Sequence, residues 1–161
     1  MKRLVVGIAI TIGAVLGLFN VSAQAAKPDT EAVLQATQQF YSALNVLFTG
    51  SSAPMEDVWS HAANITYMGP AGGLRLGWSQ IQAEWKAQAG LKLGGKVEPK
   101  DMHMTVGRDL AIVSNYEVGE NVGPDGQPQK VEIRATNLFR KEQGKWKMIG
   151  HHTDLLPFLQ K

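Results

Sequence analysis

The sequence predicts an α+β protein in which three helices in the amino-terminal half pack on one face of a curved antiparallel sheet of about six strands. Two observations support this class. Apolar residues recur at helical spacing in the first half of the chain, whereas alternating apolar and polar residues fill the second half. The turns between the later strands are short and rich in glycine, which makes neighbouring strands antiparallel.

Residues 1–25 are predicted to be a cleavable export signal, and residues 26–161 a single domain. Lys2 and Arg3 precede an apolar run, and Ala-Gln-Ala at 23–25 has the small-x-small form that signal peptidase cleaves. The run would reach about 24 Å as a helix, short of the roughly 30 Å core of a bilayer, so the alternative of a membrane anchor is disfavoured. We expect a periplasmic or secreted bacterial protein with no stable membrane anchor after cleavage.

Composition describes a globular chain that does not bind nucleic acid. Apolar residues make up 44% and charged residues 19% of the sequence, enough for a buried core. No cysteine is present, so that core, rather than disulfides, must hold the fold. The net charge of +2 comes from Lys2 and Arg3 in the leader. Without them the chain is neutral and lacks the excess of basic residues that nucleic acid binding needs.

The first predicted helix is capped by Asp29 or Thr30 and carries an apolar stripe about five turns long. A second, short helix begins at Pro54 and a third spans residues 78–89, both at helical spacing. The apolar stripe of the first helix consists of Val33, Thr37, Phe40, Leu44, Leu47 and Phe48.

The predicted strands form a hairpin between the second and third helices and a meander of four strands after the third. A sheet covered on one face by three helices tends to enclose a cavity at its open end. Its other face is expected to be polar or paired with another subunit. The hairpin covers residues 63–68 and 74–76, and the meander covers residues 97–106, 110–118, 130–140 and 145–152.

The carboxy-terminal hairpin carries the most specific pattern in the chain. A polar strand with Arg134 is followed by a glycine turn at Gly144, by Trp146 with an apolar residue two positions on, and by histidine near the strand end. In this pattern the chain resembles the nuclear transport factor 2-like superfamily, in particular its SnoaL-like branch and the association domain of calcium/calmodulin-dependent protein kinase II. The resemblance spans residues 30–157.

The resemblance implies a cone-shaped fold with a pocket between the first helix and the concave sheet face, usually in a homodimer formed through the convex face. Members serve ketosteroid isomerisation, polyketide cyclisation, dehydration, transport-factor binding and assembly, so the fold selects no reaction. We expect an exported pocket protein that binds a small molecule. It is either an acid/base enzyme acting on a small organic acid or carbonyl compound, or a noncatalytic homodimeric binding or assembly module.

His152 is the first candidate for proton transfer. Uninterrupted strand alternation places it on the face shared by Trp146 and Met148, and places His151 on the opposite face. A neutral imidazole in an apolar pocket can exchange a proton near pH 7. The alternative is a core or interface histidine that is bonded to a backbone carbonyl.

Tyr67 and Arg134 are expected to complete the site. Tyr67 would donate to an oxyanion. Arg134 would bind a carboxylate or enolate if its face of the strand is concave, and would belong to the dimer surface if that face is convex. For Trp59 the more common role of such an aromatic residue is to seal the seam between helix and sheet. The further ligand-binding candidates are Trp59, Tyr116, His61 and Asn137.

The sequence predicts neither a metal site nor a cofactor. The four histidines have no paired spacing, and cysteine is absent. Ketosteroid isomerases use a carboxylate base that projects into the pocket, and residues 63–68 contain none. Asp57 and Asp101 are the nearest substitutes, so the steroid reaction is disfavoured.

Overall fold

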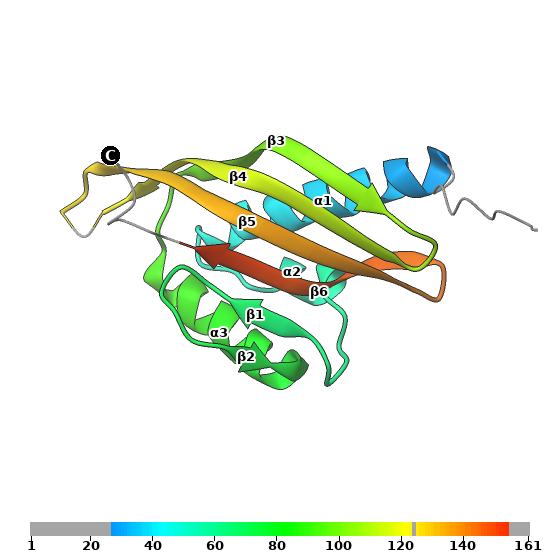
Figure 1. The fold of residues 1–161 in the computed structure, drawn as a ribbon. Coiled ribbons are helices and arrows are strands. Elements are labelled where there is room, and N and C mark those ends of the chain that lie inside the picture. Colours follow the sequence, from blue (N-terminus) through cyan, green and yellow to red (C-terminus); the bar gives the residue numbers. More distant parts are fainter. Residues whose placement is uncertain (1–26, 124, 155–161) are drawn as a thin grey trace, which may run out of the picture.

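The computed structural model describes residues 27–123 and 125–154, so the predicted export signal lies outside the described residues. Three helices and six strands make up this part of the chain (Figure 1). In chain order they are α1 (Lys27–Leu47), α2 (Pro54–Val58), β1 (Thr66–Met68), β2 (Arg75–Leu76), α3 (Gly77–Leu91), β3 (Lys96–Val106), β4 (Leu110–Val122), β5 (Pro128–Glu142) and β6 (Lys145–Asp154). The predicted α+β class is confirmed.

The six strands form one open, mixed sheet in the order β2-β1-β6-β5-β4-β3. The hairpin of β1 and β2 and the meander from β3 to β6 are antiparallel, as the sequence predicts. The expectation of a wholly antiparallel sheet is wrong at one pair, because β1 runs parallel to β6. A helix and four strands separate these two strands along the chain, so no tight turn dictates their relative direction.

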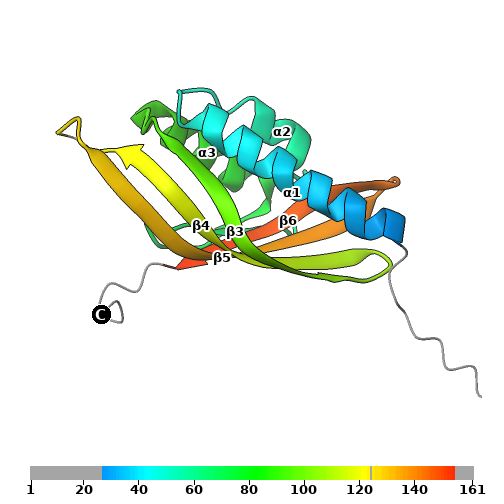
Figure 2. The same cartoon turned by 90° about the horizontal axis from the view of Figure 1, so that it is seen from above.

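The three helices lie on the same side of the curved sheet (Figure 2). The predicted stripe of α1 faces inward, and Val33, Phe40 and Leu47 are fully buried. α1 begins at Lys27, so Asp29 lies in its first turn instead of capping it. Its carboxylate accepts hydrogen bonds from the side chains of Lys141 and Trp146, which ties the start of α1 to the hairpin of β5 and β6.

A glycine permits the direct turn from β2 into α3. Gly77 has a φ of 72°, and a Cβ at this position would lie 3.2 Å from the carbonyl oxygen of Ala63. Only glycine adopts this conformation without strain. The turn places Ile81 and Trp85 against the core, where both are buried. No helix within the described ranges has both the length and the hydropathy needed to span a membrane.

Candidate functional site

A cavity of about 920 Å³ lies between the sheet and the carboxyl-terminal parts of α1 and α3. Leu44 of α1, Phe48 directly after α1 and Trp85 of α3 form apolar walls, and Tyr67 of β1 lines the cavity as well. The last paired residues of β5 and β6 are Arg134 and Asp154, so residues 128–133 of β5 extend past the described end of β6. This part of β5 also lines the cavity, at its mouth.

A buried hydrogen-bond network connects four elements beside the cavity. The Tyr41 hydroxyl donates to Glu117 Oε1 at 3.1 Å and accepts from Asn115 Nδ2 at 2.8 Å. Asn137 Nδ2 donates to Asn115 Oδ1 at 3.0 Å, and Asn137 Oδ1 lies 2.7 Å from His151 Nδ1. An amide oxygen only accepts, so His151 Nδ1 carries the proton of that bond. The Nε2 of neutral His151 is therefore unprotonated, and it lies 3.6 Å from Glu117 Oε1.

Burial shifts the pKa values of the carboxyl and the imidazole of the network in opposite directions. It raises the pKa of Glu117 from 4.5 to about 7, against a smaller lowering by the hydrogen bond from Tyr41. Burial, with a smaller contribution from the charge of His152, lowers the pKa of His151 from 6.5 to about 3. His151 is therefore neutral at pH 7, and its contact with Glu117 is not an ion pair. Near pH 7 Glu117 is divided between its acid and its base form.

Two polar groups of the cavity wall have unused hydrogen-bonding capacity. None of the described residues hydrogen-bonds Glu117 Oε2. The Tyr67 hydroxyl accepts from Gln88 Nε2 at 2.7 Å, but within the described ranges its own proton has no acceptor. Burial raises the pKa of Tyr67 to about 12, so the hydroxyl keeps its proton. Among the lining residues, Glu117 thus carries a free acceptor and Tyr67 a free donor, and the buried Nε1 of Trp85 is a further donor with no partner in the described ranges.

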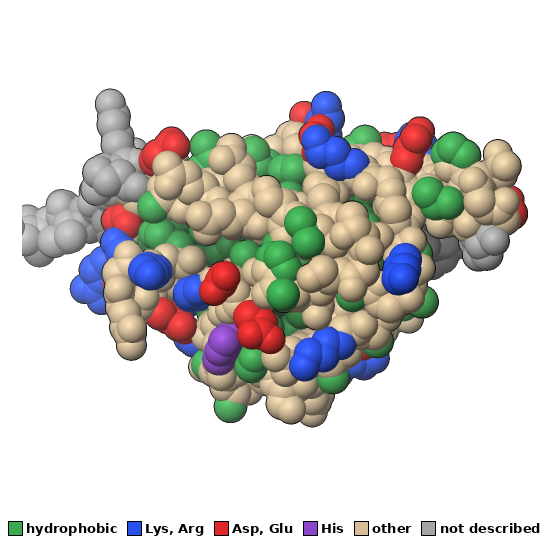
Figure 3. All heavy atoms as spheres, turned by 180° about the vertical axis from the view of Figure 1, so that it is seen from behind, with side chains coloured by type: hydrophobic (Ala, Val, Ile, Leu, Met, Phe, Trp, Pro, Cys, Tyr) green, Lys and Arg blue, Asp and Glu red, His purple; other side chains and the backbone are tan. Residues whose placement is uncertain are grey.

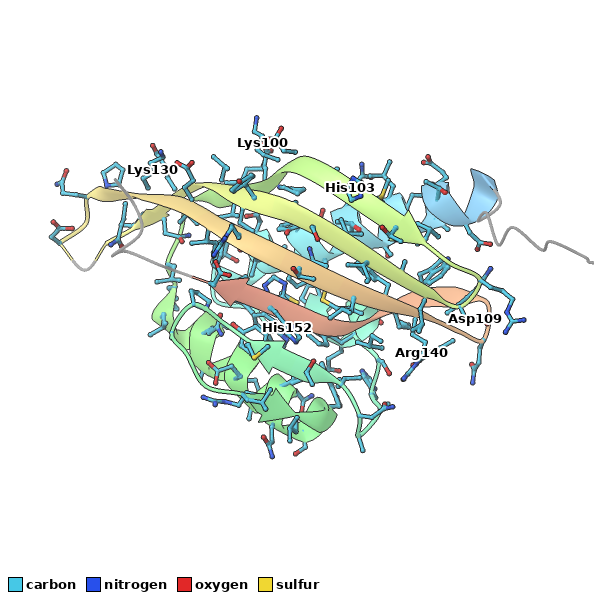
Figure 4. All side chains as sticks on the ribbon, in the orientation of Figure 1. Lys100, His103, Asp109, Lys130, Arg140 and His152 are labelled. Carbon is cyan, nitrogen blue, oxygen red and sulfur yellow. The ribbon has the colours of Figure 1, made fainter. Side chains whose placement is uncertain are left out.

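The expected orientation of His152 is wrong, because a β-bulge interrupts β6. Leu138 pairs with Gly150 but Phe139 pairs with Met148, so Ile149 is an extra residue on β6. The extra residue reverses the alternation beyond it. His151 consequently shares the inner face with Met148 and is 3% exposed. His152 lies on the outer face of β6, where its Nε2 is 2.8 Å from Thr66 Oγ1 (Figure 4).

Arg134 and Tyr116 are register neighbours on the outer face of the sheet and reach only the rim of the cavity. Arg134 therefore lies on the convex face of the sheet, which is the second of the two placements that the sequence left open. It pairs with Asp154 at 2.9 Å. Asn137 faces inward but is fully buried within the network and does not line the cavity.

Trp59 and His61 lie away from the cavity lining. Trp59 is buried in the core, its ring centroid 5.9 Å from that of Trp85, in agreement with the sealing role. His61 is exposed and stacks on Trp78 with ring centroids 4.4 Å apart. Of the sequence-based candidates, Tyr67 alone lies on the buried wall of the cavity within the described part of the chain. No result tests the functional role of any of these residues, which remains a prediction.

The sequence analysis did not single out Glu117, Tyr41 or Asn115. A signal for Glu117 exists in the alternation of β4, where its side of the strand carries Ala111 and Val113. An acidic residue on the apolar side of an alternating strand is unusual unless it is paired or functional. The inward carboxylate is therefore on β4, not on β1. Asp57 and Asp101, which the sequence offered as substitutes, are both exposed.

The curved sheet, the long helix across it and the polar cavity between them define an NTF2-like α+β fold. The family model of the SnoaL-like domain matches residues 33–155, and the chain belongs to this family. The resemblance stated from the sequence is thereby confirmed. No curated protein matches the sequence.

Solved structures share this fold at low sequence identity. A Streptomyces avermitilis protein provisionally named a dehydratase of the NTF2-like family has a TM-score of 0.71 and 21% identity, covering 81% of this chain and 97% of that chain. A Thiobacillus denitrificans protein provisionally named a calcium/calmodulin-dependent protein kinase type II association domain has a TM-score of 0.64 and 26% identity. The match covers 75% of this chain and 92% of that chain. A Shewanella frigidimarina protein provisionally named a ketosteroid isomerase has a TM-score of 0.61 and 21% identity. The match covers 76% of this chain and 94% of that chain. These neighbours show the fold and leave the reaction open.

Proposed function

We propose that the cavity is an acid/base site in which Glu117 exchanges a proton with a small carbonyl compound. The observation that carries the proposal is the Glu117 carboxyl, which is 4% exposed, lines the cavity and has a pKa raised to about 7 by burial. A general acid or base is most effective when its pKa lies near the working pH. Tyr67 supplies a hydroxyl that can donate to the carbonyl oxygen as negative charge develops there.

The rest of the network positions Glu117. Tyr41 holds Oε1 and leaves Oε2 for the ligand. His151 places the unprotonated Nε2 3.6 Å from Oε1 of the same carboxyl, so this neighbour adds no positive charge that would hold Glu117 in its ionised form. Dehydratase and ketosteroid isomerase, the names of two structural neighbours, both denote reactions in which protons are moved, which agrees with the proposal.

A proton-exchange assay tests this function without a known substrate. The protein would be incubated in D2O with 2-tetralone or cyclohexanone, and loss of the α-proton signal would be followed by NMR. We expect the wild type to accelerate exchange and Glu117→Gln to lower the rate by about 10²-fold or more. Glu120→Gln, which changes an exposed carboxylate on the same strand outside the cavity lining, is the matched control and should leave the rate unchanged. Equal rates for wild type and Glu117→Gln would contradict an acid/base role.

The second candidate function is a noncatalytic homodimeric binding or assembly module. The sheet face turned to the viewer in Figure 1 has no helix over it, and Ile112 and Tyr116 on it are 43% and 45% exposed. A structural neighbour named as an association domain agrees with this candidate. Sedimentation of the wild type and of Ile112→Lys tests it. A dimer that Ile112→Lys dissociates, together with no proton exchange, would favour the module over the enzyme.

Export to the periplasm or the medium remains part of the proposed function. It is supported by the sequence of residues 1–25 alone, with the basic start, the apolar run and the Ala-Gln-Ala motif. Mass spectrometry of the protein expressed with its leader in a bacterial host tests it. We expect the mature chain to begin at Ala26, and an intact leader would contradict the proposal.

A further inference from the structure

We infer that the cavity selects an uncharged ligand with a planar ring and one group that both donates and accepts a hydrogen bond, and that it rejects carboxylates. This inference rests on the proposed function and narrows its ligand class. It excludes the small organic acid that the sequence left as one alternative.

The basic side chains at the cavity mouth are already paired. Lys130 contacts Glu132, and Arg134 pairs with Asp154 at 2.9 Å. Lys130 is labelled in Figure 4, at the end of the sheet away from Asp109. Among the described lining residues no other lysine or arginine is present. The buried wall therefore offers no cation to a ligand carboxylate, and the anion clamp that the sequence expected at Arg134 is turned outward.

The buried wall instead carries a carboxyl group of its own. A ligand carboxylate beside Glu117 would lose its hydration and would also face a like charge once Glu117 ionises. An ammonium group could pair with Glu117, but burying both charges costs several kilocalories per mole in desolvation that a single contact does not reliably return. An uncharged ligand avoids both costs.

The free polar groups of the wall specify what the ligand must present. Glu117 Oε2 is an available acceptor when ionised, and the Tyr67 hydroxyl is an available donor. A group with both an N–H or O–H and a carbonyl-type oxygen carries a hydrogen-bond partner for each of the two. A primary amide is the simplest neutral group of this kind.

Flat side chains shape the wall around these polar groups. Tyr67 and Trp85 have ring centroids 4.6 Å apart, and the imidazole of His151 is stacked on Tyr67 at 5.8 Å with an interplanar angle of 16°. Phe48 adds a further aromatic surface. Aromatic walls with few, fixed polar groups are typical of sites for planar ring ligands.

Three probes of nearly equal shape test the charge preference. They are 2-naphthamide, 2-naphthoate and 2-(aminomethyl)naphthalene, and their binding would be measured by titration calorimetry at about pH 8, where a group with a pKa of about 7 is mostly ionised. We expect the amide to bind about tenfold or more tightly than naphthoate. In Glu117→Gln the like charge is gone, so the affinity for naphthoate should rise and the preference should largely disappear. The control Glu120→Gln, which changes an exposed carboxylate of β4 outside the cavity lining, should keep the preference of the wild type.

The outcomes separate this inference from the proposed function. Naphthoate or the amine binding as tightly as the amide, an unchanged preference in Glu117→Gln, or no binding of any probe would overturn the ligand class. None of these results depends on turnover, because the proton-exchange assay uses a ketone and reports on chemistry. Selective amide binding without proton exchange would remove the acid/base role and keep the ligand class.

Discussion

The inner face of the sheet has two halves of opposite character, although the same strands β4, β5 and β6 build both. Near the turns at the Asp109 end of the sheet, labelled in Figure 4, the inward residues Val113, Phe139 and Met148 are fully buried and apolar. Farther along, the alternation of β4 places Glu117 inward, and the bulge of β6 turns His151 inward, beside the cavity. The first half is sealed by packing, and the second is held by hydrogen bonds.

The difference shows how a fold of this kind separates stability from a site. Buried polar groups are costly unless they are hydrogen-bonded, and the network around Tyr41 satisfies nearly all of them. In the described part of the chain, the capacity left over lies on Glu117 and Tyr67, which line the cavity, and on the buried Nε1 atoms of Trp59 and Trp85. Charges elsewhere are mixed, and the face seen in Figure 3 shows acidic and basic side chains interspersed. The site is therefore distinguished by its burial rather than by the charge of the surface.

The largest expected effect is in the sealed half. Phe139→Ala removes a fully buried ring and leaves a cavity, so we expect a loss of about 3–5 kcal/mol in the free energy of unfolding. Urea denaturation monitored by circular dichroism measures it. Leu138→Ala, on the outer face of the same strand, is the control and should cost clearly less. Equal losses for the two variants would mean that the two faces do not differ as described.

An intermediate effect, with a defined pH dependence, is expected in the polar half. The pKa of Glu117 is about 7 in the folded chain and 4.5 ordinarily, so folding takes up a proton between these values and stability falls as the pH rises through them. The Glu117→Gln variant has no carboxyl at this position and therefore does not lose stability in this way as the pH rises. We expect the stability of the variant relative to the wild type to grow by at most about 3 kcal/mol between about pH 4 and pH 8. Denaturation at several pH values measures it.

The pKa shift of His151 changes stability with pH in the opposite direction, but it does not obscure the difference between Glu117→Gln and the wild type. Its pKa is lowered from 6.5 to about 3, so the stability it contributes is lost as the pH falls through this range. His151 is present in both proteins, and its contribution largely cancels in the difference. A difference that stays constant with pH would show that Glu117 is not held in its acid form by burial. Glu132→Gln, on the exposed rim, should show no such trend.

The smallest effect is expected on the outer face. Arg134 is 57% exposed at its side chain and pairs with Asp154 on the surface, so Arg134→Ala should cost less than about 1 kcal/mol in unfolding free energy. The affinity for 2-naphthamide should be unchanged, since the guanidinium is turned away from the buried wall. Calorimetry and urea denaturation measure both quantities. A large loss of affinity would place Arg134 in the binding site, where the sequence first suggested it.

Long periodic segments were predictable, because each is decided by its own residues. The stripe of α1 is buried as expected, the hairpin of β1 and β2 has formed, and the meander from β3 to β6 is antiparallel. Of the site, the sequence analysis found Tyr67 and the neighbourhood of the two adjacent histidines. It assigned His152 to the inner face because alternation was counted without the bulge at Ile149.

By itself, the sequence determined the α+β class, the helix that crosses the sheet and the family to which the chain belongs, since these depend on local periodicity and short turns. Tertiary structure alone decided which histidine faces inward, and it brought Glu117, Tyr41 and His151 together from three separate elements. The physical reason is that side-chain direction in a strand depends on pairing register with its neighbour. A single inserted residue reverses that direction, and burial then sets the proton affinity of whatever group has turned inside.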